Sequence, residues 1–555
     1  MTDIRISMRV RFASGQDAAN LPVQVIEVGV TTYDVGKTRS DGTIDAFLRR
    51  RRQIRILWFA FDDPTDRPQL RVVISDPAGH SVQTPPLPIF VLPPEFNPSA
   101  SASQALRPLV DANAPGYVFL VRKDGAVWAD ATRGLARANA PGVIAQDMAN
   151  DTIVHLASMS KPITATALVA MIDDWRNMRD AVAAMGSPGA PTQILRLGPL
   201  EIAVPSVLVP LFSDRSRAAA FLHGTWLAQV HPKARYALDA FANHGGTISP
   251  QPVAPPGYFG LLRRVIDQVA VPDDADPFLP LIRARLDPAA TIGAGVDLIT
   301  IGDLLTHRTD LASRPLNATL HTAAEIAAVA PSEPVGGLAT NDYWGFVKLL
   351  LREPCNRQPN SNYGNNNFTV LTTVIEACTD TTFDDYVTRR LFFDDRFNRI
   401  RRRVVDPSQG ALYYQGTAPN WTGGVLLSDY SNWPGNGGFY ATANQLTDWL
   451  HALYTRAPVA GVSGNAPLIS AAGLSKLFDT TAFFCLGIAN RLGPPDAAKR
   501  YQHNGGTGPN GGSVAGNLAI IVTPSGSVYS ALFVANGNVG ADPPFEAAVS
   551  KLPWA

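Results

Sequence analysis

The first 95 residues alternate apolar and polar side chains with the two-residue period of a half-buried β-strand. The period is clearest in IRISMRV (4–10), and VQVIEVGV (23–30) and QIRILWFAF (53–61) are further β-rich runs. A proline-rich segment over residues 85–98 is typical of a semi-rigid linker. The pattern therefore predicts a small all-β module over residues 1–95.

From about residue 105 the pattern of apolar and polar residues changes and predicts alternating helices and strands. Residues 116–134 predict a β-hairpin, and residues 513–537 predict two strands joined by a turn. Small apolar residues recur at helical spacing over residues 155–175, which predicts a buried helix with Ser158 at its start. A second helix is expected over residues 299–311. The remainder of the chain is thus a mixed α and β domain.

Composition narrows the class of protein. Of the 555 residues, 46% are hydrophobic and 17% are charged, which favours a large folded core over a disordered chain. The 47 basic and 47 acidic residues give zero formal net charge, which argues against a nucleic-acid binder. We see no apolar stretch of about 18 residues, so no membrane span is expected.

The N-terminal segment and the cysteine pattern both favour a reducing compartment. The N-terminal segment lacks the apolar core of a secretory signal. The cysteines, Cys355, Cys378 and Cys485, form no C-x-x-C pair and cannot build a disulfide framework. We expect a soluble cytoplasmic protein.

The first candidate for chemistry is Ser158-Met159-Ser160-Lys161, an S-x-x-K element at the start of the predicted helix. Residues i and i+3 share one face of a helix, so the Lys161 amine is expected beside the Ser158 hydroxyl. A buried lysine loses its proton more readily and can act as a base toward serine. A capping serine with a surface lysine is the alternative at this stage.

Two later motifs combine polar side chains with glycines. Tyr363 and Asn365 form a Y-x-N element just before an apolar, helix-like stretch, and His503 precedes Gly505 and Gly506 in an H-x-G-G element. A phenol can relay a proton and a carboxamide can orient an acyl group. Glycine lets a backbone approach a substrate closely. Taken singly, the Y-x-N element is better explained as an Asn/Gly-rich turn, and the H-x-G-G element has a Gly-rich hairpin tip as its alternative.

The order of the three motifs resembles the β-lactamase-like serine hydrolases, which include class C β-lactamases, D,D-carboxypeptidases, D-aminopeptidases and family VIII esterases. Residues 299–311 and 435–450 are similar to two further segments of that family. The resemblance implies an α+β fold for residues 96–555, with an antiparallel sheet flanked by helices and a mainly helical lobe. The preceding residues 1–95 resemble a transthyretin-like or immunoglobulin-like sandwich.

The resemblance also assigns roles. Ser158 would be the acylated nucleophile, and Lys161 and Tyr363 would share the general acid and base work. Asn365 would orient the acyl chain of the substrate. A family member would act on a small-molecule ester or amide, with no cofactor and no metal.

The H-x-G-G element supplies the other assigned positions. His503 and Gly505 would contact the substrate, with His503 standing where β-lactamases carry the lysine of K-T-G. The backbone N–H groups of Ser158 and Gly506 would form the oxyanion hole.

Two features depart from the family. Histidine is only fractionally charged near pH 7, so His503 is a poor anchor for the carboxylate of a β-lactam. This favours a carboxylesterase, with a D-amino-acid amidase or peptidase or a D,D-carboxypeptidase as the alternative. Residues 175–290 are an insertion, which we interpret as a lid, a dimer contact or padding of the lobe.

Other classes are disfavoured. The chain contains no G-x-S-x-G nucleophile elbow and no H-E-x-x-H or C-x-x-C metal motif. An inactive binding protein on the same fold stays open, although the intact motif residues speak against it. His307 lies within the predicted helix over residues 299–311 and is interpreted as a hydrogen-bonded structural histidine. The sequence leaves the oligomeric state undecided.

Overall fold

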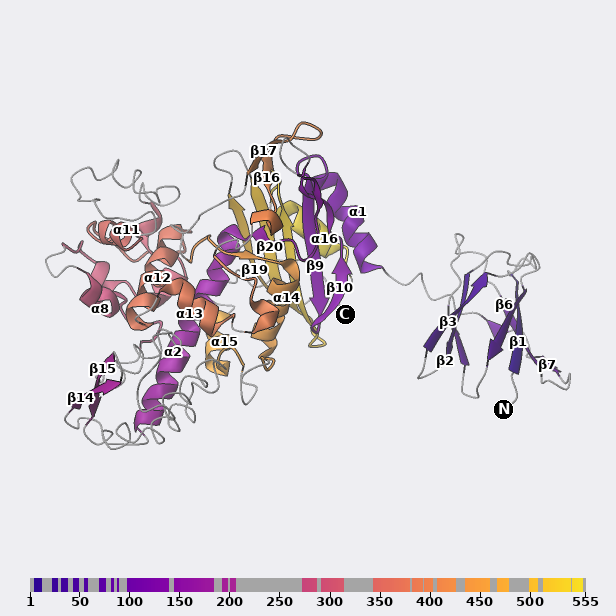
Figure 1. Ribbon diagram of the computed structural model, residues 1–555, viewed down its shortest axis with the longest axis horizontal. Helices are drawn as coiled ribbons and strands as arrows, with labels where there is room; N and C mark the ends of the chain where they lie inside the picture. The colour runs from indigo at the N-terminus through magenta and orange to yellow at the C-terminus, as the bar shows by residue number, and fades with distance from the viewer. Residues whose placement is uncertain are drawn as a thin grey trace. The chain divides into compact units, whose positions relative to one another are not determined.

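The computed structural model divides the chain into two compact units, Met1–Asn97 and Pro98–Ala555 (Figure 1). In the first unit the structure describes the backbone of strands. From residue 97 onward it describes residues 97–138, 144–183, 192–197, 200–205, 272–286, 291–313, 343–379, 382–392, 394–402, 407–425, 435–459, 467–478, 499–507, 513–540 and 542–552.

The first unit contains strands in two antiparallel sheets, ordered β4-β1-β6-β7 with β8 beside β6, and β3-β2-β5. The strands are β1 (Ile4–Arg11), β2 (Pro22–Glu27), β3 (Thr31–Lys37), β4 (Thr43–Leu48), β5 (Ile54–Leu57), β6 (Gln69–Ser75), β7 (Ser81–Gln83) and β8 (Leu87–Pro88). That these sheets pack as a sandwich stays a prediction.

The second unit is built around a seven-stranded antiparallel sheet ordered β12-β11-β9-β21-β20-β19, with β10 paired to β9. Its strands are β9 (Gly116–Lys123), β10 (Ala126–Asp130), β11 (Arg133–Arg137), β12 (Gln146–Asp147), β19 (Lys499–Thr507), β20 (Val514–Val522) and β21 (Val528–Ala535). The predicted hairpin and the predicted strand pair are therefore confirmed, and they lie in one sheet. Strand β19 forms one edge of it.

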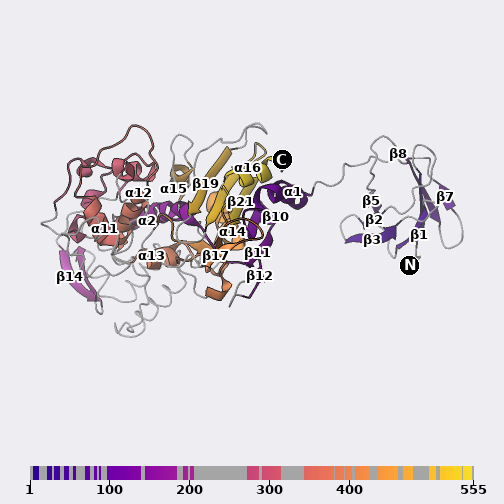
Figure 2. The same ribbon diagram turned by 90° about the horizontal axis from the view of Figure 1, so that it is seen from above.

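The alternation along β9 explains why helices cover both faces of the sheet. Tyr117 and Phe119 point into one apolar cluster, and Val118 and Leu120 point into the other. Helices α1 (Pro98–Val110) and α16 (Asp542–Ser550) cover the first face, as Figures 1 and 2 show. Helices α2 (Lys161–Ala183) and α14 (Ala443–Thr455) contribute to the cluster on the second face.

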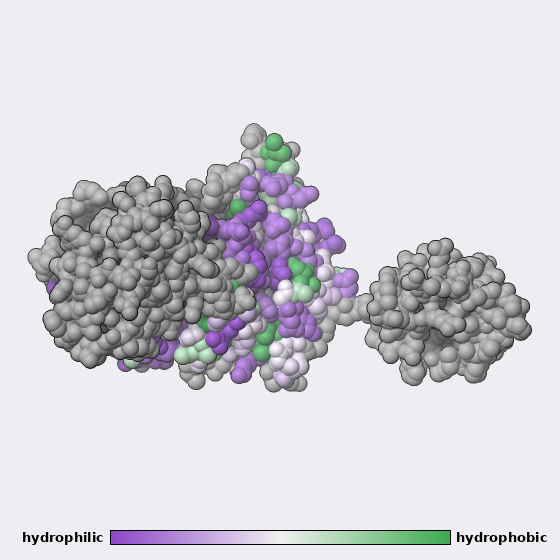
Figure 3. Space-filling model, turned by 60° about the horizontal axis from the view of Figure 1, so that its bottom comes forward, coloured by the Kyte–Doolittle hydropathy of each residue, from purple (hydrophilic) through white to green (hydrophobic). Residues whose placement is uncertain are grey.

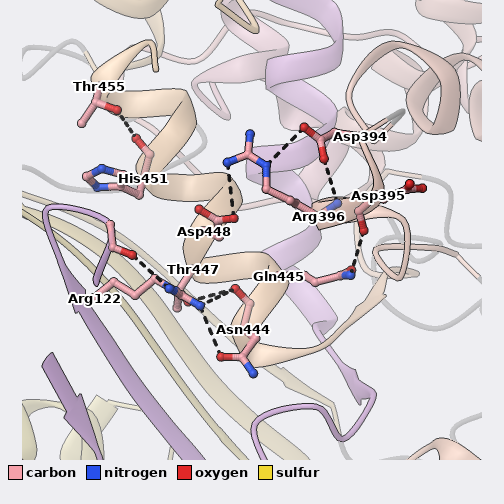
Figure 4. Close-up of polar contacts among 11 residues, drawn as sticks. Arg122, Asp394, Asp395, Arg396, Asn444, Gln445, Thr447, Asp448, His451 and Thr455 are labelled. Carbon is pink, nitrogen blue, oxygen red and sulfur yellow. Dashed lines mark hydrogen bonds and ion pairs between the residues drawn. The ribbon is translucent and has the colours of Figure 1, made fainter. Parts of the chain in front are cut away.

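Helix α14 is anchored to the sheet by polar contacts at its first turns (Figure 4). From strand β9, Arg122 donates Nε to Thr447 Oγ1 at 3.1 Å and Nη2 to Asn444 Oδ1 at 3.3 Å. On the other side of the helix, Arg396 pairs with Asp394 at 3.2 Å and with Asp448 at 3.7 Å. These contacts hold α14 between the sheet and the helical lobe.

A helical lobe flanks the sheet domain (Figure 1). Helix α12 runs through it with every residue from Asn366 to Thr379 buried. The other helices of this part are α8 (Leu279–Ile282), α9 (Ile301–Leu305), α11 (Tyr343–Leu350), α13 (Phe383–Arg390) and α15 (Ala471–Leu477). The second unit also contains short two-stranded pairings: β13 (Val154–His155) with β18 (Tyr440–Ala441), β14 (Thr192–Leu197) with β15 (Leu200–Pro205), and β16 (Tyr413–Gln415) with β17 (Thr422–Val425). The last pair lies beside the main sheet, where Tyr414 bridges to Ser513 next to β20 (Figure 1).

Two helix predictions need correction. The helix expected over residues 299–311 is only α9, because His307 adopts a left-handed backbone with φ +57° just beyond it. The helix expected over residues 155–175 begins only at Lys161, after a 3₁₀ turn over Ala157–Ser160, and continues to Ala183. Within the predicted insertion of residues 175–290 the structure describes the end of α2, the hairpin of β14 and β15 and residues 272–286, and the rest lies outside the described residues.

The exposed surface, the lengths of the helices and the cysteines add little to the description of the fold. On the face shown in Figure 3, the described residues are mostly hydrophilic, and the apolar ones form small separate groups. No helix among the described residues is long and apolar enough to cross a bilayer. Cys355 and Cys378 are buried, and Cys485 lies outside the described residues.

Candidate active site

Ser158 lies in a tight turn between the sheet and helix α2. The turn is a 3₁₀ helix, Ala157–Ser160, that leads directly into α2. Ala157 adopts φ +47°, a conformation that an alanine takes only when its surroundings hold it there. The buried imidazole of His155 contributes, because its Nδ1 accepts a hydrogen bond from the Ala157 N–H at 3.3 Å.

Strand β19 packs directly against this turn. A Cβ added to Gly505 would lie 2.5 Å from the carbonyl oxygen of Leu156 and 3.1 Å from the backbone nitrogen of Met159. Only glycine lets the strand approach the turn so closely. Gly505 and Gly506 thus lie inside an edge strand beside Ser158.

Lys161 is fully buried behind Ser158. Its Nζ lies 2.9 Å from Ser158 Oγ, 2.8 Å from Asn365 Oδ1 and 2.8 Å from the carbonyl oxygen of Asn436. Burial lowers the pKa of Lys161 well below its ordinary value. A neutral amine has two hydrogens for the Asn365 and Asn436 oxygens and a lone pair for the Ser158 hydroxyl. The arrangement therefore provides a base for Ser158.

Tyr363 is the second side chain that contacts the nucleophile. Its hydroxyl donates to Ser158 Oγ at 2.6 Å. The side chain is 43% exposed, yet the hydroxyl end is desolvated, which raises the pKa of Tyr363 to about 12. The phenol therefore keeps its proton at neutral pH and is an acid rather than a base in the resting site.

Asn365 is the first residue of α12 and lies beside Lys161. Its Oδ1 accepts from the lysine amine, which fixes which end of the carboxamide faces Lys161. The same lysine amine lies 4.7 Å from the centre of the Tyr363 ring. Lys161 thus connects the Y-x-N element to the nucleophile, as the S-x-x-K spacing alone could not show.

His503 lies on β19 next to the Tyr363 ring, with 6.2 Å between ring centroids. Its Nδ1 lies 2.6 Å from the carbonyl oxygen of Asn504, so the ring proton sits on Nδ1. Burial and the nearby Lys161 amine lower the pKa of His503 to about 3. His503 is therefore uncharged at neutral pH, which is a stronger statement than the fractional charge expected from sequence.

Two positions at the site carried no functional assignment from sequence. Asn436 supplies a backbone carbonyl to Lys161 and is held by a bond from its Nδ2 to Thr369 Oγ1 at 2.8 Å. His155 braces the turn before Ser158. A carbonyl has no side-chain signature, and a buried histidine in a short strand looks like any core residue.

No group of three or more His, Cys, Asp or Glu side chains among the described residues is arranged to hold a metal ion.

Comparison with protein families decides the affiliation. The model of the Beta-lactamase family matches residues 102–540. The chain belongs to this family. The match covers both the helical lobe and the sheet, so the α+β fold of a β-lactamase or penicillin-binding protein is established for the second unit. The search of curated proteins gives no match to the chain.

Several solved structures are similar to this chain. D-stereospecific amidohydrolase from Streptomyces sp. shares 15% identity, with 82% of this chain and 99% of that chain covered and a TM-score of 0.43. D-amino acid amidase from Ochrobactrum anthropi SV3 shares 13%, with 82% and 98% covered and a TM-score of 0.45. EstCE1, described as a hydrolase with promiscuous acyltransferase activity, shares 13%, with 82% and 99% covered and a TM-score of 0.45. At these identities and TM-scores the likeness assigns no substrate.

Proposed function

We propose that this member of the β-lactamase family is a serine hydrolase that forms an acyl-enzyme at Ser158 and acts on carboxylic esters. The observation that carries the proposal is the position of Ser158 Oγ, 2.9 Å from the Lys161 amine and 2.6 Å from the Tyr363 hydroxyl. A hydroxyl held between a buried amine whose charged form is disfavoured and a phenol that keeps its proton is arranged for nucleophilic attack.

Acylation follows from the protonation states. Lys161 takes the hydroxyl proton of Ser158 as Oγ forms a bond to the acyl carbon. The backbone N–H groups of Ser158 and Gly506 are proposed to stabilise the oxyanion. The bond from the acyl carbon to the leaving oxygen then breaks, and Tyr363 gives its proton to that oxygen. The proton on Lys161 restores the phenol.

In deacylation the same side chains activate a water molecule. A water molecule attacks the acyl carbon of the ester formed on Ser158 and gives one proton to the Lys161 and Tyr363 pair. The bond to Oγ breaks, and Ser158 recovers a proton from the pair. The products are an alcohol and a carboxylic acid, and the enzyme returns to its starting state.

The charge of the site supports a neutral acyl donor. His503 is uncharged at neutral pH, and burial disfavours the charged form of Lys161. A carboxylate on the substrate would therefore meet no strong cation at His503 where β-lactamases present a lysine. An ester without a carboxylate loses nothing by this replacement.

A substrate panel tests the proposal. The purified chain is assayed with short-chain p-nitrophenyl esters, D-phenylalanine amide, a D-alanyl-D-alanine peptide and a penicillin, each beside Ser158→Ala. We expect ester turnover that Ser158→Ala abolishes. Preferential turnover of the D-amino-acid amide or the peptide would favour the amidase or D,D-carboxypeptidase alternative. Turnover of none of them, with no labelling by a fluorophosphonate, would favour an inactive binding protein.

A further inference from the structure

We propose that His307 is a positioning residue that holds the Tyr363 phenol against Ser158 by accepting a hydrogen bond from the backbone next to Tyr363. This inference rests on the proposed function, because it gives Tyr363 the task of protonating the leaving group. His307 does not touch Ser158 in this arrangement, and it acts through Tyr363.

The backbone on both sides of Tyr363 is bonded to His307. The Asn362 N–H donates to the His307 carbonyl oxygen at 2.7 Å. The Gly364 N–H donates to His307 Nδ1 at 3.2 Å. One residue therefore fixes the peptide groups before and after the phenol, and the side chain of Tyr363 leaves the backbone between two anchored points.

The backbone of His307 is shaped for this task. It follows helix α9 with φ +57°, in the left-handed region that non-glycine residues enter rarely. This reversal turns the His307 carbonyl and ring toward the loop that carries Tyr363. A left-handed backbone is strained for a histidine, so the surrounding contacts must hold it in place.

The ring of His307 also supports the ring of Tyr363. Their centroids are 4.7 Å apart, and the centroid of Phe368 lies 5.3 Å away on α12. His307 is buried, whereas Tyr363 is 43% exposed. The Tyr363 ring also contacts the Lys161 amine and the His503 ring, and His307 adds to this ring contact a bond to the backbone beside the phenol.

The protonation state of His307 is set by its neighbours. The Asn367 Nδ2 lies 3.2 Å from the same Nδ1, and the Thr309 hydroxyl donates to Asn367 Oδ1 at 2.5 Å. That hydroxyl orients the carboxamide so that Nδ2 faces the imidazole. Nδ1 therefore receives N–H donors and carries a lone pair. Burial, with the nearby Lys161 amine and the His503 ring, also lowers the pKa of His307.

The chemical consequence is specific to the leaving group. Proton transfer by a positioned acid contributes about 10²- to 10⁴-fold to a rate. A nitrophenolate leaves without a proton, whereas an alkoxide needs one. Misplacing Tyr363 should therefore slow the hydrolysis of an alkyl ester far more than that of the matching nitrophenyl ester.

The experiment compares p-nitrophenyl butyrate with ethyl butyrate in wild type, His307→Leu, His307→Asn and Tyr363→Phe, each shown to be folded by circular dichroism. We expect His307→Leu to lower kcat/KM for the ethyl ester by about 10²-fold and for the nitrophenyl ester by less than about tenfold. Tyr363→Phe should show the same selectivity, and adding His307→Leu to it should cost little more. His307→Asn tolerates the left-handed backbone and keeps an acceptor, so it should recover part of the loss on the ethyl ester.

The outcomes separate the two claims. Equal losses on both esters, or full additivity with Tyr363→Phe, would overturn the positioning role while leaving the proposed function standing. A wild-type protein inactive on both esters would overturn the proposed function and this inference with it. Since kcat/KM reports acylation when that step is the first irreversible one, slow deacylation does not confuse the comparison.

Discussion

Replacing Gly505 by alanine should damage catalysis through the backbone alone. The added Cβ would lie 2.5 Å from the carbonyl oxygen of Leu156, so β19 must move by about 0.9 Å to reach the 3.4 Å at which ordinary contact begins. A displacement of about 1 Å at a reacting centre can cost about 10²-fold in rate. Overpacking of this kind also costs about 1–3 kcal/mol of folding free energy.

The assay is kcat/KM on a p-nitrophenyl ester, with urea unfolding of the same protein. Gly506→Ala is the matched variant, because among the described residues its Cβ would meet only the carbonyl oxygen of Val514 at 3.6 Å, and its N–H is retained. We expect a loss of about 10²-fold for Gly505→Ala and a much smaller loss for Gly506→Ala. Equal activity of the two variants would refute the close packing of β19 on the nucleophile turn.

The other predictions concern charge and domain structure. Burial lowers the pKa of Lys161, so between its folded-state pKa and the ordinary lysine pKa of 10.5 the unfolded chain binds more protons than the folded chain. The contribution of Lys161 to the free energy of unfolding therefore rises with pH over this range. Lys161→Met should therefore abolish turnover yet raise the urea midpoint at pH 7, and an unchanged or lower midpoint would contradict the burial cost. His503→Lys should improve turnover of a carboxylate-bearing substrate relative to a neutral ester, and efficient penicillin hydrolysis by the wild type would contradict the account of His503. Removal of Met1–Asn97 should leave ester turnover within about threefold, because the second unit has its own core; a folded but inactive truncation would show that the first unit completes the site.

The sequence predicted the parts of the site that depend on local spacing. Ser158 and Lys161 lie three residues apart at the start of a helix, so their contact follows from helix geometry. Helix α9 likewise begins with a capping box between Thr300 and Asp303, which is a local signal. The roles of Tyr363, Asn365 and His503 came only from resemblance to a family, because their spacing along the chain says nothing about proximity.

The features of the site that the sequence did not predict depend on contacts between segments far apart in the chain. The Asn436 carbonyl reaches Lys161 across 275 residues, and any residue type could supply it. His307 ends α9 early because its left-handed backbone is stabilised by Asn362 and Gly364, a later part of the chain. Burial of His503, which removes its charge, is a product of the assembled sheet and lobe. Hydrophobic periodicity contains none of this information.

The most direct test of the central claim is the site of covalent labelling. The wild-type chain is treated with a fluorophosphonate, digested and examined by peptide mass spectrometry, in parallel with Ser158→Ala shown to be folded. We predict one adduct, on the peptide containing Ser158, whose formation is slowed by a competing ester and lost in Ser158→Ala. An adduct that persists in Ser158→Ala, or that maps to another residue, would contradict the assignment of Ser158 as the nucleophile.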